Sequence, residues 1–142
     1  MPTATDPALA SALRGAVMML GRRLRRERGT DALSSSQIGA LASLDRHGAL
    51  TLGELANHEY VRPPSMTRIV ASLEEAGLVT RAADPTDGRQ VILSATAEGS
   101  RLLEADRQRR DAWLARQMQT LTADERDTLR RAAVIIDRIS RS

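Results

Sequence analysis

Residues 51–94, TLGELANHEYVRPPSMTRIVASLEEAGLVTRAADPTDGRQVILS, decide the fold of this chain. The sequence predicts two short helices at the start of this stretch, followed by two strands that a polar loop joins. The second helix is expected to begin after Arg62, because proline is favoured in the first turn of a helix and Pro63 and Pro64 come next. It is expected to end at Gly77, because glycine commonly closes helices.

The second helix of this stretch has one apolar face. Its apolar residues recur at positions i, i+3, i+4 and i+7, as in an amphipathic helix, and they are Met66, Ile69, Val70 and Leu73. Other faces near its start carry small hydroxyls and a guanidinium. Arginine can bond two acceptors on guanine, and hydroxyls reach phosphates or base edges, so this end suits a DNA major groove. We therefore expect DNA contacts here from Arg62, Pro64, Ser65, Thr67 and Arg68.

Two short apolar runs, residues 78–79 and 91–93, flank a polar loop at 82–89 and predict a β-hairpin. Arg89 is expected near the tip, where a cation can enter a narrow minor groove or lie against phosphate. Asp87 can orient that guanidinium through a charge-assisted hydrogen bond. The stretch as a whole thus reads as a helix-turn-helix with a wing. Three wing residues are expected to contact DNA: Asp87, Arg89 and Gln90.

Three segments within residues 52–93 carry a family resemblance. They are S-M-T-R near the start of the second helix, L-E-E-A-G-L-V-T-R at its exit and D-P-T-D-G-R-Q-V-I-L in the wing. These segments resemble the MarR family of bacterial regulators, and the likeness extends in length and helix order over nearly the whole chain. The wing pattern, Asp-x-Arg before an apolar strand, is its most specific part. The resemblance implies a homodimeric winged-helix repressor that a small, often phenolic or aromatic, effector releases from DNA.

Helix-start signals organise the rest of the chain. Capping boxes, which satisfy the first backbone N–H groups of a helix, are predicted at Ser34 with Gln37, Thr51 with Glu54 and Thr122 with Glu125. Asp6 before Pro7 starts the first helix, and Thr96 starts the fifth. The expected fold is mainly α, a winged helix-turn-helix with six helices and a small β-hairpin wing. The expected regions are an N-terminal dimerisation helix (1–33), the winged helix-turn-helix (34–95) and C-terminal dimerisation helices (96–142).

The first and last helices each have an apolar stripe. The stripes are Leu9, Leu13, Val17, Leu20 and Leu24 in the first, and Leu129, Ala132, Ala133, Ile136 and Ile139 in the last. A small winged domain lacks the surface to cover them, so pairing with a second copy is expected. Two-fold symmetry would place the second helix of the motif, the recognition helix, of each copy roughly 34 Å from that of the other, which predicts a palindromic operator.

Composition limits the classes of protein that remain. The 142 residues suit one compact unit or two lobes, and 21 basic against 18 acidic residues leave a net charge of only +3. Such a balance says little about nucleic acid unless the basic residues are clustered. Cysteine is absent, so disulfides and thiolate chemistry are excluded. Neither a signal segment nor a membrane-length apolar run occurs, so we expect a cytoplasmic protein without membrane contact.

Nothing in the sequence points to catalysis. It contains neither a nucleophile arrangement, nor a phosphate-binding glycine loop, nor paired buried carboxylates, so we expect no enzyme and no cofactor. His47 and His58 lack the close helical spacing of a metal-binding pair, and each is ordinary in its position, so no metal site is expected.

Several residues allow two interpretations from the sequence alone. Tyr60, in the turn before the second helix, either rests against the DNA backbone or packs the turn. Trp113 is interpreted as core or dimer packing, with a ligand platform as the alternative. The five arginines within residues 22–28 form either a solvated face that complements the helix dipole or a cluster facing phosphate or a pocket.

The function itself also has alternatives. A winged helix can serve as a protein-interaction module, which an exposed apolar helix face would favour. It can also bind DNA constitutively, without an effector. The arginine of the wing and the hydroxyls at the helix start favour DNA over a protein partner.

Overall fold

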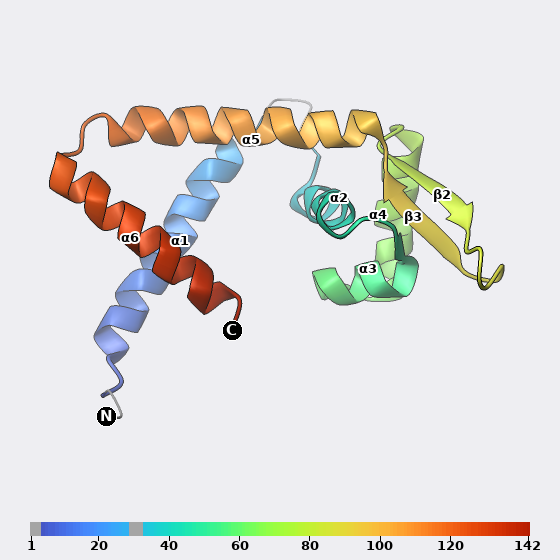
Figure 1. The fold of residues 1–142 in the computed structure, drawn as a ribbon, viewed down its shortest axis with the longest axis horizontal. Coiled ribbons are helices and arrows are strands. Elements are labelled where there is room, and N and C mark those ends of the chain that lie inside the picture. Colours follow the sequence, from blue (N-terminus) through green and yellow to red (C-terminus); the bar gives the residue numbers. More distant parts are fainter. Residues whose placement is uncertain (1–3, 29–32) are drawn as a thin grey trace. The chain divides into compact units, whose positions relative to one another are not determined.

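The computed structural model describes residues 4–28 and 33–142, and within them it has six helices and three strands (Figure 1). The mainly α, winged architecture expected from the sequence is therefore confirmed. In chain order the elements are α1 (Pro7–Arg26), α2 (Ser35–His47), β1 (Leu50–Thr51), α3 (Leu52–Glu59), α4 (Pro63–Glu75), β2 (Val79–Ala83), β3 (Val91–Ala95), α5 (Ala97–Met118) and α6 (Ala123–Ser140).

The chain divides into two compact units by its internal contacts. The central unit is Gly29–Gln108, and the end unit combines Met1–Arg28 with Arg109–Ser142. The division falls inside α5, so this helix contributes its first half to the central unit and its second half to the end unit. The winged helix-turn-helix lies within the central unit.

Three helices begin with the capping boxes that the sequence predicted. In each box the N-cap hydroxyl accepts a hydrogen bond from the backbone N–H three residues later. The Gln or Glu side chain at that position accepts one in return, at distances between 2.8 and 3.2 Å, in the pairs Ser34–Gln37, Thr51–Glu54 and Thr122–Glu125. The hydrogen bonds from Thr51 hold the pKa of Glu54 below its ordinary value. Each cap contributes about 1 kcal/mol to helix stability.

The strands β2 and β3 form the predicted hairpin, and β1 adds a strand that the sequence did not predict. Within the described residues the strands pair antiparallel in the order β1-β3-β2, with Leu50 opposite Leu93 and Val79 opposite Ala95. Because β1 has only two residues, it is too short to show the alternation that identifies a strand in a sequence. It ties the start of α3 to the sheet that carries the wing.

The hydrophobic core of the central unit joins α2, α3, α4, the sheet and the first half of α5. The predicted inner face of α4 is buried in it at Met66, Val70 and Leu73. At the start of α5, Gly99 allows a close approach to the sheet, because a Cβ there would lie 2.5 Å from the carbonyl oxygen of Leu78. The core therefore places the recognition helix, and Gly99 sets how near α5 comes.

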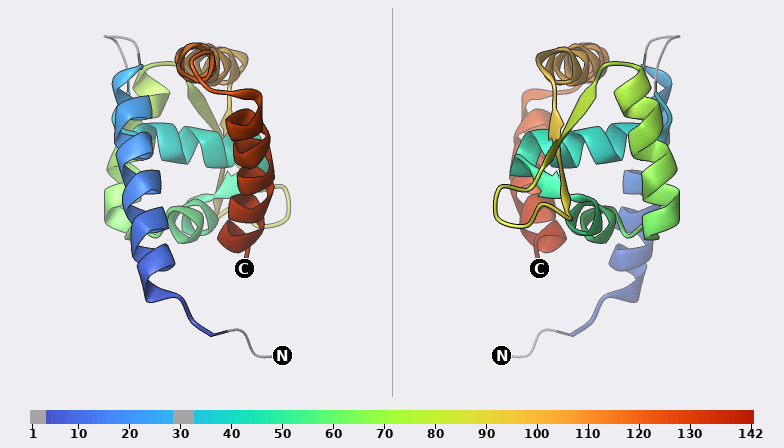
Figure 2. Two further views of the ribbon diagram at one scale, coloured as in Figure 1. Left: turned by 90° about the vertical axis from the view of Figure 1, so that its left-hand side faces the viewer. Right: turned by 90° about the vertical axis from the view of Figure 1, so that its right-hand side faces the viewer.

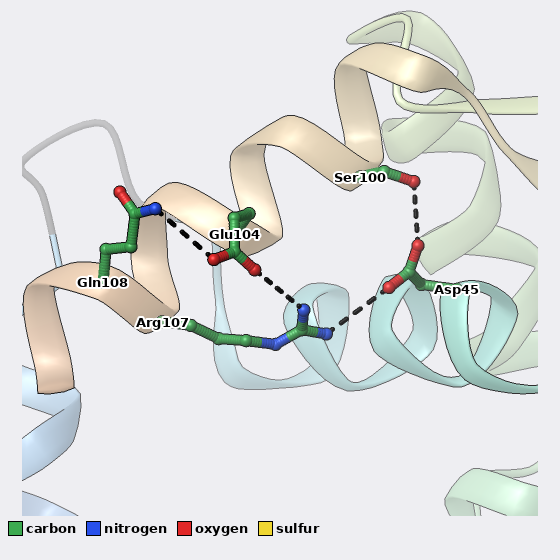
Figure 3. Close-up of polar contacts among 5 residues, drawn as sticks. All are labelled: Asp45, Ser100, Glu104, Arg107 and Gln108. Carbon is green, nitrogen blue, oxygen red and sulfur yellow. Dashed lines mark hydrogen bonds and ion pairs between the residues drawn. The ribbon is translucent and has the colours of Figure 1, made fainter.

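A polar network joins α5 to α2 inside the central unit (Figure 3). The carboxylate of Asp45 accepts a hydrogen bond from Ser100 at 2.8 Å and pairs with Arg107 at 3.4 Å. Glu104 pairs with the same guanidinium at 3.4 Å and accepts a hydrogen bond from Gln108. Exposed pairs contribute little singly, whereas a network shares the cost of ordering its side chains. The network runs along α5 up to the division between the units.

The end unit contains two helices with open apolar faces. Neither α1 nor α6 has a buried residue in the described structure, and Figure 2 shows the two helices separated along much of their length. The Arg23 guanidinium carbon lies 4.5 Å from the centre of the Trp113 ring and so connects α1 to α5. The exposed large apolar side chains of the two helices are Leu9, Leu13, Val17, Met18, Met19, Leu20, Leu129, Val134, Ile135 and Ile139.

Candidate nucleic-acid interface

One face of α4 near its start packs into the core, and the opposite face is exposed to solvent. Its N-cap is Arg62, whose side chain makes no capping hydrogen bond, and prolines occupy the first two helical positions. Met66 and Val70, one and two turns along, are buried beneath, so the helix cannot rotate without exposing them. The structure leaves four of the five predicted contact residues of α4 exposed and one half-buried; the exposed ones are Arg62, Pro64, Thr67 and Arg68, and the half-buried one is Ser65.

Thr67 and Arg68 offer different chemistry to a ligand. Thr67 is exposed, and its hydroxyl donates its proton to the Pro63 carbonyl oxygen at 3.0 Å, so the hydroxyl oxygen can still act as an acceptor. Phosphate has only acceptors, so Thr67 suits a base amino group or a thymine methyl better than the DNA backbone. None of the described residues pairs with the guanidinium of Arg68, which is free to bond to guanine or phosphate.

The wing loop is held by its own aspartates. The carboxylate of Asp84 accepts hydrogen bonds from the backbone and the hydroxyl of Thr86 at 2.9 and 2.8 Å, and these bonds hold the pKa of Asp84 below its ordinary value. The Asp87 carboxylate accepts from the backbone N–H of Arg89 at 3.1 Å. The backbone of Gln90 donates to the Asp87 carbonyl and accepts from the Asp84 N–H, each at 3.0 Å. Two side chains and a backbone bridge therefore set the loop shape.

The expectation that Asp87 orients the Arg89 guanidinium is corrected by this geometry. Asp87 bonds to the backbone of Arg89, and within the described residues the guanidinium has no acidic partner. The reason is local, because a carboxylate two residues before a free N–H readily closes a turn onto it. Arg89 is exposed, as is Gln90 at the end of the loop. The wing thus presents an exposed guanidinium that makes no direct ion pair with the described residues.

The recognition helix and the wing are joined by an ion pair that sequence reasoning missed. Arg81 of β2 bonds to Glu74 of α4 at two points, of which the Nε to Oε2 distance is 2.8 Å. Hydrogen bonding with Arg81 lowers the pKa of Glu74, and the carboxylate raises the pKa of Arg81 in return. In Figure 1 the start of α4 and the wing loop lie toward the same end of the central unit. The pair therefore fixes two elements that can act on one surface.

The turn between α3 and α4 has a left-handed residue. Tyr60 has φ 54° and ψ 40°, and its N–H bonds back to the end of α3. Its side chain is 97% exposed, so of the two interpretations left open by the sequence, packing of the turn is wrong. The preceding residue, Glu59, accepts a hydrogen bond from Ser43 of α2 at 2.5 Å and lies against Gly39. The turn is thus attached to α2 on one side, and the tyrosine points away from it.

His47 and His58 are brought together by the packing of α2 on α3. Their ring centroids lie 4.2 Å apart and the ring planes differ by 15°, which is a stacked arrangement. Stacked rings present faces to one another, whereas metal binding needs their in-plane lone pairs to converge. In residues 4–28 and 33–142, His, Asp and Glu side chains form no group of three or more that could hold a metal ion. No helix in the described part of the chain is long and apolar enough to cross a membrane.

The inner face of α4 is buried, its N-terminal end is exposed, and the β2–β3 hairpin carries an exposed arginine. These features define a winged helix-turn-helix DNA-binding regulator. The sequence model of the MarR family matches residues 33–91. A Mycobacterium tuberculosis protein named as an HTH-type transcriptional regulator is 50% identical over 129 residues, which are 91% of this chain and 90% of that one. The chain belongs to the MarR family of transcriptional regulators.

Solved structures agree over the full length. A transcriptional regulator protein of Pseudomonas aeruginosa matches with a TM-score of 0.88 and 37% identity, covering 99% of both chains. A MarR family protein of Bacillus stearothermophilus matches with a TM-score of 0.83 and 25% identity, covering 98% of this chain and 100% of that one. The family fold therefore extends to α1, α5 and α6, which lie beyond the matched motif.

Proposed function

We propose that this regulator binds a palindromic operator as a homodimer and represses the genes beside it. The observation that carries the proposal is that the start of α4 and the wing together carry three exposed guanidinium groups, Arg62, Arg68 and Arg89, none of which has an acidic partner among the described residues. A cation that no carboxylate neutralises is available for phosphates and base edges. Direct contacts would come from these residues with Pro64, Ser65, Thr67 and Gln90, while Asp87 shapes the loop.

The open faces of α1 and α6 support the homodimer. Val134 is 67% and Met19 66% exposed, and apolar side chains at this density are unusual on a surface that meets only water. A second copy of the same chain can cover both helices with one self-complementary contact. The two recognition helices would then meet successive major grooves, roughly 34 Å apart, on a palindrome.

Repression and control by an effector are supported by the relatives. A Bacillus subtilis relative, 34% identical over 66% of this chain, is named as an HTH-type transcriptional repressor. A structural neighbour with a TM-score of 0.65 and 28% identity, NadR, was solved with 4-hydroxyphenylacetate. A small aromatic acid is accordingly the class of effector to test here. It would release DNA only if it binds better to a dimer whose recognition helices are wrongly spaced for the operator.

The polar character of the exposed side of α4 favours DNA over a protein partner. Its exposed positions near the start are two arginines, two prolines and a threonine, whereas a helix that recruits a protein partner commonly offers an apolar stripe. The site of action would be the cytoplasm, where bacterial DNA is available.

Selection of bound sequences from random duplex DNA tests the proposal. The expected result is a two-fold symmetric motif whose half-sites are one helical turn apart. Fluorescence anisotropy should then show tight binding to the whole motif and weak binding to one half. Enrichment of no motif at low salt, or sedimentation as a monomer at every concentration, would refute the proposal. Titration with phenolic acids in the same assay tests the effector.

A further inference from the structure

The turn between the two helices of the motif exposes the chain's only tyrosine. Tyr60 is 97% exposed, the largest exposed fraction among the large apolar and aromatic residues that the structure describes. It is also the only described residue other than glycine with a positive φ. The ring therefore makes almost no packing contact in the single chain, and the residue also bears the strain of a left-handed backbone.

The neighbours of Tyr60 determine the direction of its side chain. Glu59 points inward, where it accepts the Ser43 hydrogen bond at 2.5 Å. Val61 packs partly buried against the core, and its N–H bonds to the Ala56 carbonyl at 3.0 Å. With the residues on either side held against the central unit, the ring between them is directed outward. Backbone strain that the surroundings impose in this way is typical of functional positions.

We propose that Tyr60 contacts the sugar-phosphate backbone of operator DNA, with its ring on a deoxyribose and its phenol donating to a phosphate oxygen. This inference rests on the proposed function. Tyr60 lies two residues before Arg62, the N-cap of α4, so a helix that enters the major groove by its first turn brings this segment to the strand bordering that groove. The phenol supplies a donor, and phosphate oxygens supply acceptors.

Two substitutions separate this role from a structural one. Tyr60→Asn removes the ring but suits the left-handed conformation better, so the melting temperature should stay the same or rise while operator affinity falls about tenfold. Tyr60→Phe keeps the ring and removes the donor, so affinity should fall about threefold. Stability and binding would then move independently, which loss of folding cannot explain. Arg101→Ala, which alters an exposed residue of α5, serves as the control and should leave affinity unchanged.

Chemical modification gives an independent measurement, because a single tyrosine makes nitration by tetranitromethane specific to this site. In the free protein Tyr60 should react readily, and the selected operator should protect it at least fivefold, whereas an unrelated duplex at high salt should not. The inference is overturned if the wild-type protein binds its operator while Tyr60→Asn binds equally well, or if bound operator leaves nitration unchanged. If the wild-type protein selects no DNA sequence at all, the proposed function fails, and this inference fails with it.

Discussion

Glu74 at the end of α4 and Arg81 in β2 form a two-point ion pair, with Nε and Oε2 2.8 Å apart, that joins the recognition helix to the wing. Both residues lie within the same short segment, on either side of the Gly77 turn, so this local contact sets the angle between two elements proposed to act on DNA. The two carboxylate oxygens are matched to the fork of the guanidinium, a geometry that lysine could not supply.

This pair predicts a pH-dependent contribution to stability. Arg81 lowers the pKa of Glu74 from its ordinary value of 4.5, so the stabilisation is fully present above that value and is lost as the pH falls through the lower folded value. Glu74→Gln should therefore reduce the urea midpoint at neutral pH, and the difference from the wild type should vanish at strongly acidic pH. Glu98→Gln, which breaks a more exposed pair on α5, is the control and should have little effect at either pH.

Adding a single methyl group at Gly99 should destabilise the folded protein. In Gly99→Ala the new Cβ would lie 2.5 Å from the Leu78 carbonyl and 3.0 Å from Leu41 Cδ1, so α5 must shift, at about 1–3 kcal/mol of unfolding free energy. Gly53→Ala in α3 is the matched control. Its Cβ meets nothing within 4 Å, and because Gly53 lies in the first turn of α3 the change should leave stability unchanged or slightly raise it. Equal effects in chemical denaturation would show that the approach of α5 to the sheet is not tight.

Substitution of Arg68 and of Arg89 should weaken DNA binding in different ways. Arg68→Ala should cost about 1–3 kcal/mol and relax preference at one base position, if the guanidinium reads a base. Arg89→Ala should weaken binding across sequences and reduce the slope of log K against log salt by about 1, because each phosphate contact releases counterion. Anisotropy titrations at several salt concentrations measure both. Unchanged affinity in both variants would contradict the placement of the interface.

Two substitutions of Asp87 distinguish a role in shaping the wing loop from a role in orienting the Arg89 guanidinium. Because its carboxylate accepts from the Arg89 backbone at 3.1 Å, Asp87→Asn keeps an acceptor oxygen and should retain most operator affinity. Asp87→Ala loses the acceptor and should bind several-fold more weakly. If Asn proved as poor as Ala, the negative charge itself would be required, and an ion pair with Arg89 in the complex would be the better explanation.

If the apolar face of α6 lies in the dimer interface, a charge introduced there should dissociate the dimer. Ile139 is 57% exposed in the single chain, and Ile139→Arg would place an unpaired charge in the proposed interface. Sedimentation should show dissociation at concentrations where the wild type is dimeric, together with loss of operator binding. Arg138→Ala, one position away on the same helix, should leave the dimer intact. A variant that stays dimeric would exclude this face from the interface.

The sequence alone determined where several helices begin and which face of α4 is buried. The capping boxes at Ser34, Thr51 and Thr122 are present in the structure, as is the proline start of α4. These signals depend on residues only three or four positions apart, so they can be read from the sequence without knowledge of the tertiary structure. The wing hairpin follows equally from a polar turn between two β-branched runs.

Only the tertiary structure decided which distant side chains meet. Three pairs of residues distant in the sequence meet because α2, α3, α5 and the sheet share one core: Asp45 with Arg107, His47 with His58, and Leu50 with Leu93. No local sequence pattern predicts these contacts. The same holds for the full exposure of Tyr60, which depends on Glu59 and Val61 being held to the central unit on either side. Local hydrogen bonding and periodicity specify elements, whereas the packing of those elements selects the contacts between them, and it is that packing which leaves Tyr60 facing outward.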